Sequence, residues 1–133
     1  MQTAGYGMYQ QIQTETSSPG ELLLLLYGAL HRKLLQAETA LEARDWEAAH
    51  PPLLLAQEIV LELTASLDME SGELAEQLAA LYDYCYRRLV DANVKKDPDA
   101  VREVQGLTRP LREAWTSAVQ ATMPAAVEGV HRG

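Results

Sequence analysis

The stretch Ser18-Pro19-Gly20-Glu21-Leu22-Leu23-Leu24-Leu25-Leu26-Tyr27 decides the fold of this chain. It opens with a capping box, in which the Ser18 hydroxyl accepts from the amide of Glu21 and the Glu21 carboxylate reaches back to the amide of Ser18. Pro19 suits the first helical position, where an amide would have no partner. The spacing that follows predicts a core-facing helix that starts near Pro19 and fades near Arg44. Its apolar stripe consists of Leu23, Leu26, Tyr27, Leu30, Leu34, Ala37 and Leu41.

A second helix is expected after Asp45, whose carboxylate can cap a helix that begins at Trp46. Pro51 and Pro52 come too late to belong to its first turn. They remove two backbone donors and clash with the preceding turn, so we expect a kink or a break, followed by a helix over residues 52–66. Its core residues are Leu53, Ala56, Ile59, Val60, Leu63 and Leu67.

Two more helices complete the pattern. The third follows the loop 68–72, with Ser71 as its cap, and ends near Lys95. The fourth begins at Pro98, which follows a capping acid, and Pro110 should bend it by removing one backbone bond. The third stripe consists of Leu74, Leu78, Leu81, Cys85, Leu89 and Ala92, and the fourth of Ala100, Val104, Leu107, Leu111, Ala114, Trp115 and Ala118.

Four long helices with short connections predict an all-α fold, an antiparallel up-and-down four-helix bundle over residues 18–119. Residues 1–17 are rich in Gln, Thr, Ser and Gly and show no sustained period, so we interpret them as a mobile N-terminal arm, with a short extra helix as the alternative. Residues 120–133 are interpreted as a flexible C-terminal tail. A chain of 133 residues fits one such domain.

Composition excludes several classes of partner. The formal net charge of −8 opposes nucleic acid, whose binding depends on clustered Lys and Arg. A single cysteine, Cys85, cannot form an internal disulfide, which favours a reducing compartment. The sequence shows no signal-peptide pattern and no apolar run long enough to span a bilayer. We therefore expect a cytoplasmic protein without membrane insertion.

No catalytic or metal site is expected. His31, His50 and His131 have no Cys or His neighbour at metal-ligand spacing. The sequence contains neither a glycine-rich phosphate loop nor a nucleophile elbow. Cys85 falls in the third core stripe, where a buried thiol is ordinarily inert. The prediction is a protein that is not an enzyme and needs no cofactor.

A histidine phosphotransfer domain is an alternative, because it is also a four-helix bundle and His31 falls outside the first core stripe. Such domains resemble one another in a small residue shortly after the histidine. Here the residues that follow are Arg32, Lys33, Leu34 and Leu35, which disfavours this alternative.

The first three helices contain more apolar residues than one core stripe needs, when residues are placed about 100° apart around each axis. Apolar surface of this extent usually marks a partner site, here a groove for an amphipathic helix. The alternatives are burial by the arm, by a fifth helix or by self-association as a weak homodimer. A glycine within a helix, as at Gly28, costs roughly 1 kcal/mol and permits close approach of another chain. The candidate groove residues are Leu22, Leu25, Gly28, Leu54, Leu61, Ala75, Ala79, Tyr82, Tyr86 and Val90.

Several stretches between Tyr9 and Val119 match one known family in order. They are Thr16-Ser17-Ser18-Pro19-Gly20-Glu21-Leu22, Leu26-Tyr27-Gly28-Ala29, Leu67-Asp68-Met69-Glu70-Ser71-Gly72-Glu73, Leu81-Tyr82-Asp83-Tyr84-Cys85-Tyr86-Arg87-Arg88-Leu89, Asp91-Ala92-Asn93, Glu103-Val104-Gln105-Gly106-Leu107 and Glu113-Ala114-Trp115. Through them the chain resembles the flagellin-specific secretion chaperones, the FliS family. The stretch from Leu81 to Leu89 is the most specific.

The resemblance implies a chaperone that wraps the disordered C-terminal region of flagellin, prevents premature polymerisation and delivers the flagellin to the type III flagellar export apparatus. It also implies that the arm covers an apolar site in the free protein and contacts the flagellar export gate protein when the chaperone is loaded. The arm residues concerned are Tyr6, Met8, Tyr9 and Ile12. A helical-bundle binding module or regulator with a different client is the alternative. Pro51-Pro52 and Pro110 depart from the helix formers expected in the family.

Overall fold

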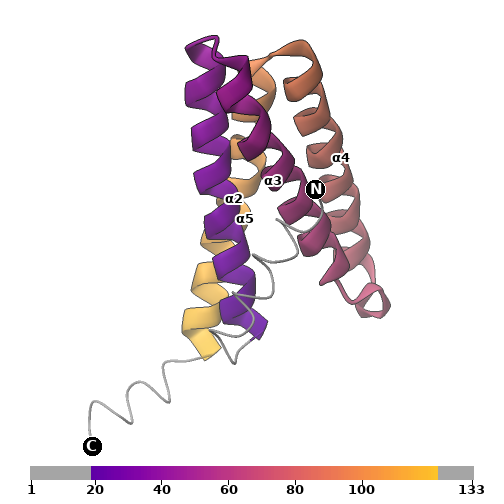
Figure 1. Ribbon diagram of the computed structural model, residues 1–133. Helices are drawn as coiled ribbons and strands as arrows, with labels where there is room; N and C mark the ends of the chain where they lie inside the picture. The colour runs from indigo at the N-terminus through magenta and orange to yellow at the C-terminus, as the bar shows by residue number, and fades with distance from the viewer. Residues whose placement is uncertain (1–18, 123–133) are drawn as a thin grey trace, which may run out of the picture.

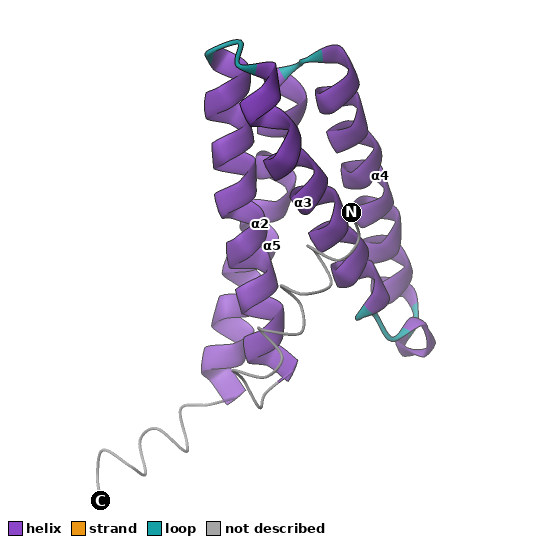
Figure 2. Cartoon of the chain, in the orientation of Figure 1, coloured by secondary structure: helices purple, strands orange, loops and turns teal. Residues whose placement is uncertain are grey.

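The computed structural model describes residues 19–122 (Figure 1). This part of the chain is helical apart from short connections and contains no β-strand (Figure 2). The predicted all-α fold is therefore confirmed. The elements are α2 (Pro19–Glu42), α3 (Trp46–Ala65), the 3-10 turn η1 (Met69–Ser71), α4 (Glu73–Lys95) and α5 (Pro98–Thr122).

Some predictions concern residues outside the described range. They are the arm over residues 1–17 with Tyr6, Met8, Tyr9 and Ile12, the capping hydroxyl of Ser18, and the tail from residue 123 onward with His131. The first three residues of the predicted tail, 120–122, belong to α5.

Successive helices run in opposite directions, and each packs against two others (Figure 1). Helix α2 packs against α3 and α5, and α4 packs against the same two helices, so α2 and α4 are diagonal partners. The connections 43–45 and 96–97 lie at the upper end of Figure 1. At the lower end α2 begins, α5 ends and the chain turns through residues 66–72. Short connections leave neighbouring helices antiparallel, which confirms the up-and-down topology.

Two helix starts follow their predicted signals. The Asp45 carboxylate accepts a hydrogen bond from the amide of Ala48 at 3.1 Å, and α3 begins directly after it. The Asp97 carboxylate accepts from the amide of Asp99 at 2.9 Å, and α5 begins at Pro98. Both carboxylates satisfy amides that have no partner within their helix.

The prediction of Ser71 as the cap of α4 is wrong. Ser71 belongs to η1, which Asp68 caps by accepting from the amide of Glu70 at 3.1 Å. Gly72 then precedes α4 with φ of 99°, and no side chain caps the helix. A positive φ is a conformation that glycine adopts readily, so Gly72 reverses the chain between η1 and α4 where a serine cap was expected.

Of the predicted kink or break at Pro51 and Pro52, the break does not occur, because α3 continues through both residues, and a kink stays a prediction. The two prolines leave the carbonyls of Glu47 and Ala48 without their usual helical donors. Both of these residues are exposed, so water can satisfy the carbonyls and the helix persists. Helix α5 likewise continues through Pro110. A bend at Pro110 stays a prediction, because a continuous helix can still curve.

The core stripe of α4 differs from the predicted one near its N-terminus. Leu74 was expected inside but is 63% exposed, whereas Ala75 and Tyr82 are buried. Leu81 is half-buried. The core positions alternate by three and four residues, as in a coiled-coil seam, because this face of α4 packs toward α3 as well as α5. They are Ala75, Leu78, Tyr82, Cys85, Leu89 and Ala92.

The stripe of α5 needs a similar correction. Ala114 and Ala118 are exposed, whereas Val119 and Thr108 are buried. Thr108 can be buried because its hydroxyl donates to the carbonyl of Val104 at 2.8 Å. A polar residue therefore occupies a core position that a pattern of apolar residues alone does not reveal.

Neighbouring leucines on α2 test this assignment of the core. Leu34 is fully buried and Leu35 is 60% exposed. We expect Leu34→Ala to lower the free energy of unfolding by about 2–5 kcal/mol and Leu35→Ala by less than about 0.5 kcal/mol. Urea unfolding followed by circular dichroism measures both. Equal losses for the two variants would contradict the assigned face of α2.

Candidate functional site

Seven of the predicted groove residues lie on the adjacent helices α3 and α4, and five of these are not fully buried. Leu54 and Leu61 belong to α3, and Ala79, Tyr86 and Val90 belong to α4. We name these five residues the α3/α4 seam. Since α3 packs against α4 along the bundle, the seam lies on the side away from α2 and α5.

A hydrogen bond between side chains shows that these faces meet. The Asn93 amide nitrogen on α4 donates to Nδ1 of His50 on α3 at 2.9 Å. Tyr86 precedes Asn93 by seven residues, and Leu54 follows His50 by four. Residues at such spacings lie on one side of a helix, and Leu61 extends the same side from Leu54. The seam is therefore one strip along both helices.

The seam is apolar and partly open. Leu61 is 51% exposed, and Leu54, Ala79 and Val90 are half-buried. Tyr86 is half-buried against the core. A single exposed leucine is ordinary on a protein surface, but a row of half-open apolar side chains suits a partner that completes their burial.

Ala75 and Tyr82 were predicted to line the groove, but the structure places both in the core. Tyr82 is 2% exposed, and its hydroxyl is hydrogen bonded to the hydroxyl of Tyr27. Burial raises the pKa of both tyrosines, and the contact between them raises that of Tyr27 further. Both residues therefore belong to the scaffold that supports the seam.

The three predicted groove residues of α2 lie outside the seam and differ in exposure. Leu25 is 43% exposed and Leu22 is half-buried. Gly28 is buried, and a Cβ atom at that position would meet the guanidinium groups of Arg32 and Arg112, each at 3.6 Å. Because Arg112 belongs to α5, Gly28 faces α5 and not the α3/α4 seam.

An apolar cavity lies at the lower end of the bundle. Two predicted groove residues, Ala75 and Tyr82, line it, together with Leu74 and Trp115, which were predicted to lie in the core. The cavity measures about 230 Å³, and Leu78 is also among its lining residues. A second cavity of about 270 Å³ lies beside it and shares Trp115. A dry apolar cavity of about 150 Å³ can hold benzene, so each has room for a large apolar side chain. The signal in the sequence was Leu74, an apolar residue in a first helical turn.

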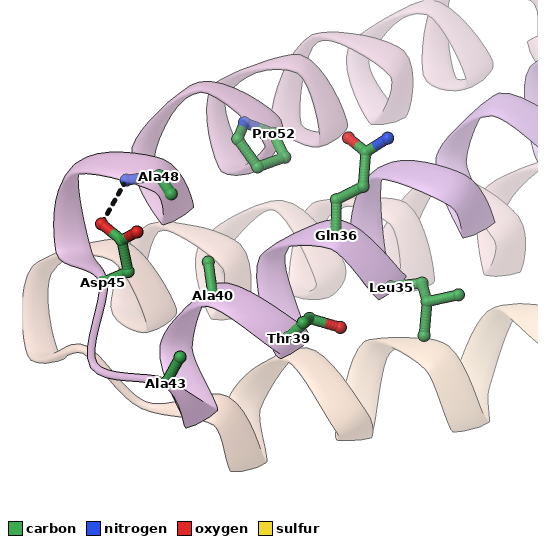
Figure 3. A pocket seen from close by; sticks show the side chains of 8 residues that line it. All are labelled: Leu35, Gln36, Thr39, Ala40, Ala43, Asp45, Ala48 and Pro52. Atoms are coloured by element: carbon green, nitrogen blue, oxygen red, sulfur yellow. Dashed lines mark hydrogen bonds between the residues drawn. The ribbon is translucent and has the colours of Figure 1, made fainter.

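A further groove lies between α2 and α3 at the upper end (Figure 3). Its volume is about 630 Å³, and its lining includes Leu35, Ala40 and Pro52. The one carboxylate in the lining, Asp45, accepts the capping bond from Ala48 that Figure 3 shows. The Asp45 carboxylate therefore serves as the N-cap of α3.

Part of the family-like stretch 81–89 is structural. Arg88 on α4 donates to Glu103 on α5 at 2.7 Å and pairs with Asp91 at 3.0 Å. The Tyr84 hydroxyl donates to the same Glu103 carboxylate at 2.6 Å. These two hydrogen bonds, from Tyr84 first and then Arg88, lower the pKa of Glu103. The cluster joins α4 to α5, so these residues hold the bundle together.

Within residues 19–122 no group of three His, Cys, Asp or Glu side chains could hold a metal ion. Over the same range, no helix is long and apolar enough to cross a membrane.

Comparison with known proteins first identifies the class, flagellar secretion chaperones. The FliS chaperone of Bacillus subtilis (strain 168) is 40% identical over 116 residues, which covers 87% of this chain and 86% of that protein. The FliS chaperone of Salmonella typhimurium is 38% identical over 118 residues and covers 84% and 87%. That of Escherichia coli (strain K12) is 33% identical over 121 residues and covers 86% and 89%.

A family model described as "Flagellar protein FliS" matches residues 1–122. The chain therefore belongs to the FliS family, as the stretches quoted from its sequence indicated. This is a family of flagellar export chaperones and not of enzymes, and membership implies a client protein in flagellar export.

The environment of Cys85 gives a prediction about chemistry. The side chain is fully buried, and burial raises the pKa of the thiol to about 11. At pH 8 only about a thousandth of the thiol would be ionised even if the reagent could reach it. We expect alkylation by iodoacetamide to be at least about a hundredfold slower in the folded protein than in 6 M guanidinium chloride, measured by mass spectrometry. Equal rates would show that Cys85 is accessible.

Proposed function

We propose that this protein is a cytoplasmic chaperone that binds the disordered C-terminal region of flagellin, prevents its premature polymerisation and delivers it to the type III flagellar export apparatus. The observation that most supports binding is the α3/α4 seam. Membership of the FliS family supports the setting in flagellar export.

The seam suits a segment that folds as it binds. Leu61 on α3 is exposed, and Tyr86 and Val90 on α4 are half-buried. An amphipathic helix laid along the seam would cover these side chains with one apolar face. Ordering a disordered client costs roughly 2–5 kcal/mol of the interaction energy, which keeps the complex reversible. Reversible binding is what delivery to an export apparatus requires.

The arm residues Tyr6, Met8, Tyr9 and Ile12 are proposed to cover apolar surface in the free protein and to contact the export gate protein when the chaperone is loaded. The lower-end cavities support this proposal. Pro19 and Gly20, the first described residues, line one of them, so the chain that precedes Pro19 joins the bundle at a cavity rim. Tyr9 is ten residues from Pro19, and an extended chain of that length spans up to about 33 Å.

A helical-bundle binding module with a different client, and weak self-association through the same seam, are the competing possibilities. Both would use the same apolar surface. They differ in whether the C-terminal region of flagellin is bound, and this makes flagellin the decisive probe.

The seam assignment predicts the result of a double substitution. Leu61→Asp with Tyr86→Asp places two charges where a client would bury apolar surface, so co-elution with flagellin in size-exclusion chromatography should be lost. Leu35→Asp with Ala118→Asp is the matched control, because it adds the same two charges at exposed positions on α2 and α5. It should retain binding.

Circular dichroism establishes that both variants keep their helicity. Retained flagellin binding by the folded double variant would rule out this seam. Loss of binding by Leu35→Asp with Ala118→Asp as well would show that added charge, and not its position, causes the effect.

Removal of the arm tests its covering role. Deletion of residues 1–15 should increase the fluorescence of a hydrophobic dye, because apolar surface becomes open to solvent. It should also weaken recruitment to the export gate protein more than it weakens flagellin binding. Dye fluorescence identical to that of the full chain would argue against a cover.

A further inference from the structure

An acidic protein carries a compact basic cluster between α2 and α5. The formal net charge is −8. Nevertheless, His31, Arg109 and Arg112 line one shallow pocket with a volume of about 550 Å³. Arg32 reaches the same place from α2, since its guanidinium group lies near Gly28 together with that of Arg112. We name His31, Arg32, Arg109 and Arg112 the basic cluster.

Within residues 19–122, the arginines of the basic cluster, like Arg44, form no ion pair with a carboxylate. Elsewhere in residues 19–122, Arg87 pairs with Asp83 at 2.8 Å, and Arg88 and Arg102 each pair with carboxylates. By contrast, no ion pair joins the arginines of the basic cluster to any described residue. Glu113 lines the concavity without reaching them.

Gly28 explains how two of the guanidinium groups come together. A Cβ atom on Gly28 would lie 3.6 Å from Nη1 of Arg32 and 3.6 Å from Nη2 of Arg112, so both groups lie over the bare backbone at Gly28. Like charges at such close quarters repel, and an anion between them would remove that repulsion. The arrangement therefore favours a bound anion.

His31 lies within the positive potential of these arginines. Partial burial lowers its pKa most, and Arg112 and then Arg109 lower it further. The Thr108 hydroxyl lies 3.5 Å from Nε2 of His31, at the limit of a hydrogen bond. Ser117 adds a hydroxyl group that can donate to an anion, whereas the Thr116 hydroxyl donates to the carbonyl of Arg112 at 2.7 Å.

We propose that the basic cluster binds carboxylates of an acidic segment of a partner protein. A guanidinium group matches a carboxylate with two parallel hydrogen bonds, and this concavity offers such groups from two helices. A short peptide fits better than nucleic acid, because a long phosphate backbone would meet the net negative charge beyond this small cluster. The site lies between α2 and α5, on the other side of the bundle from the α3/α4 seam, and rests on no part of the proposed function.

The test uses the full chain and a ten-residue peptide of alternating Asp, Glu and Ser, titrated at low salt and followed by the NMR signals of the arginine Nε–H groups. Arg109→Gln with Arg112→Gln should lower the affinity by about tenfold or more, since each loses a charge-assisted bond. The matched control is Arg87→Gln with Arg44→Gln, which removes the same charge from exposed arginines outside the cluster. It should change the affinity less than about threefold.

The imidazole signal of His31 gives a second readout that a merely structural role of the arginines would not produce. A bound carboxylate should raise the pKa of His31, against the lowering by Arg112, Arg109 and burial. Equal peptide affinities for the two double variants, or binding of inorganic phosphate without binding of the peptide, would overturn the proposal. The seam variant Leu61→Asp with Tyr86→Asp should still bind the peptide, because the basic cluster is a separate site. Loss of peptide binding by this folded variant would also overturn the proposal.

Discussion

The hydrogen bond between the hydroxyls of Tyr27 and Tyr82 is the constraint on which the rest of the bundle depends. It crosses the core between α2 and α4, the diagonal helices, whose backbones do not pack directly against each other. Two hydroxyl groups buried without partners would be costly, and here one hydroxyl donates to the other. A slip of either helix by one turn, about 5.4 Å, would leave both unpaired. The bond thus fixes the register that aligns Tyr86 on α4 with α3.

Helix α4 has different kinds of residue on the sides that face α3 and α5. Toward α5 it presents Tyr84 and Arg88, which converge on Glu103 and join the two helices. Toward α3 it presents Tyr86 and Val90, which stay partly open. One short stretch of sequence therefore contains both the groups that join α4 to α5 and the groups that we propose for client binding. Recognisable family sequence here includes residues that stabilise the bundle.

The helix limits were predictable because their signals are local. Asp45 caps α3 through a bond to an amide of the same helix. Pro98 favours a helix start because its ring already holds φ at a helical value. The faces were harder to predict. Whether Tyr82 points inward depends on Tyr27, which lies 55 residues away, and Gly28 belongs to a surface made by another helix. The periodicity of apolar residues identifies an apolar face on each helix, but it does not show which other helices cover that face.

The order of the helices has a consequence for how the chain folds. Three of the four helix pairings join elements that are consecutive in sequence, and only α2 with α5 brings distant segments together. Such a low contact order is typical of rapid folding, with the closing of the α2–α5 pair as the step that costs most loop entropy. Arg102 meets Glu38 and Glu42 across that pair. A protein built this way can reach its native state soon after synthesis, before its own apolar surfaces meet those of other unfolded chains.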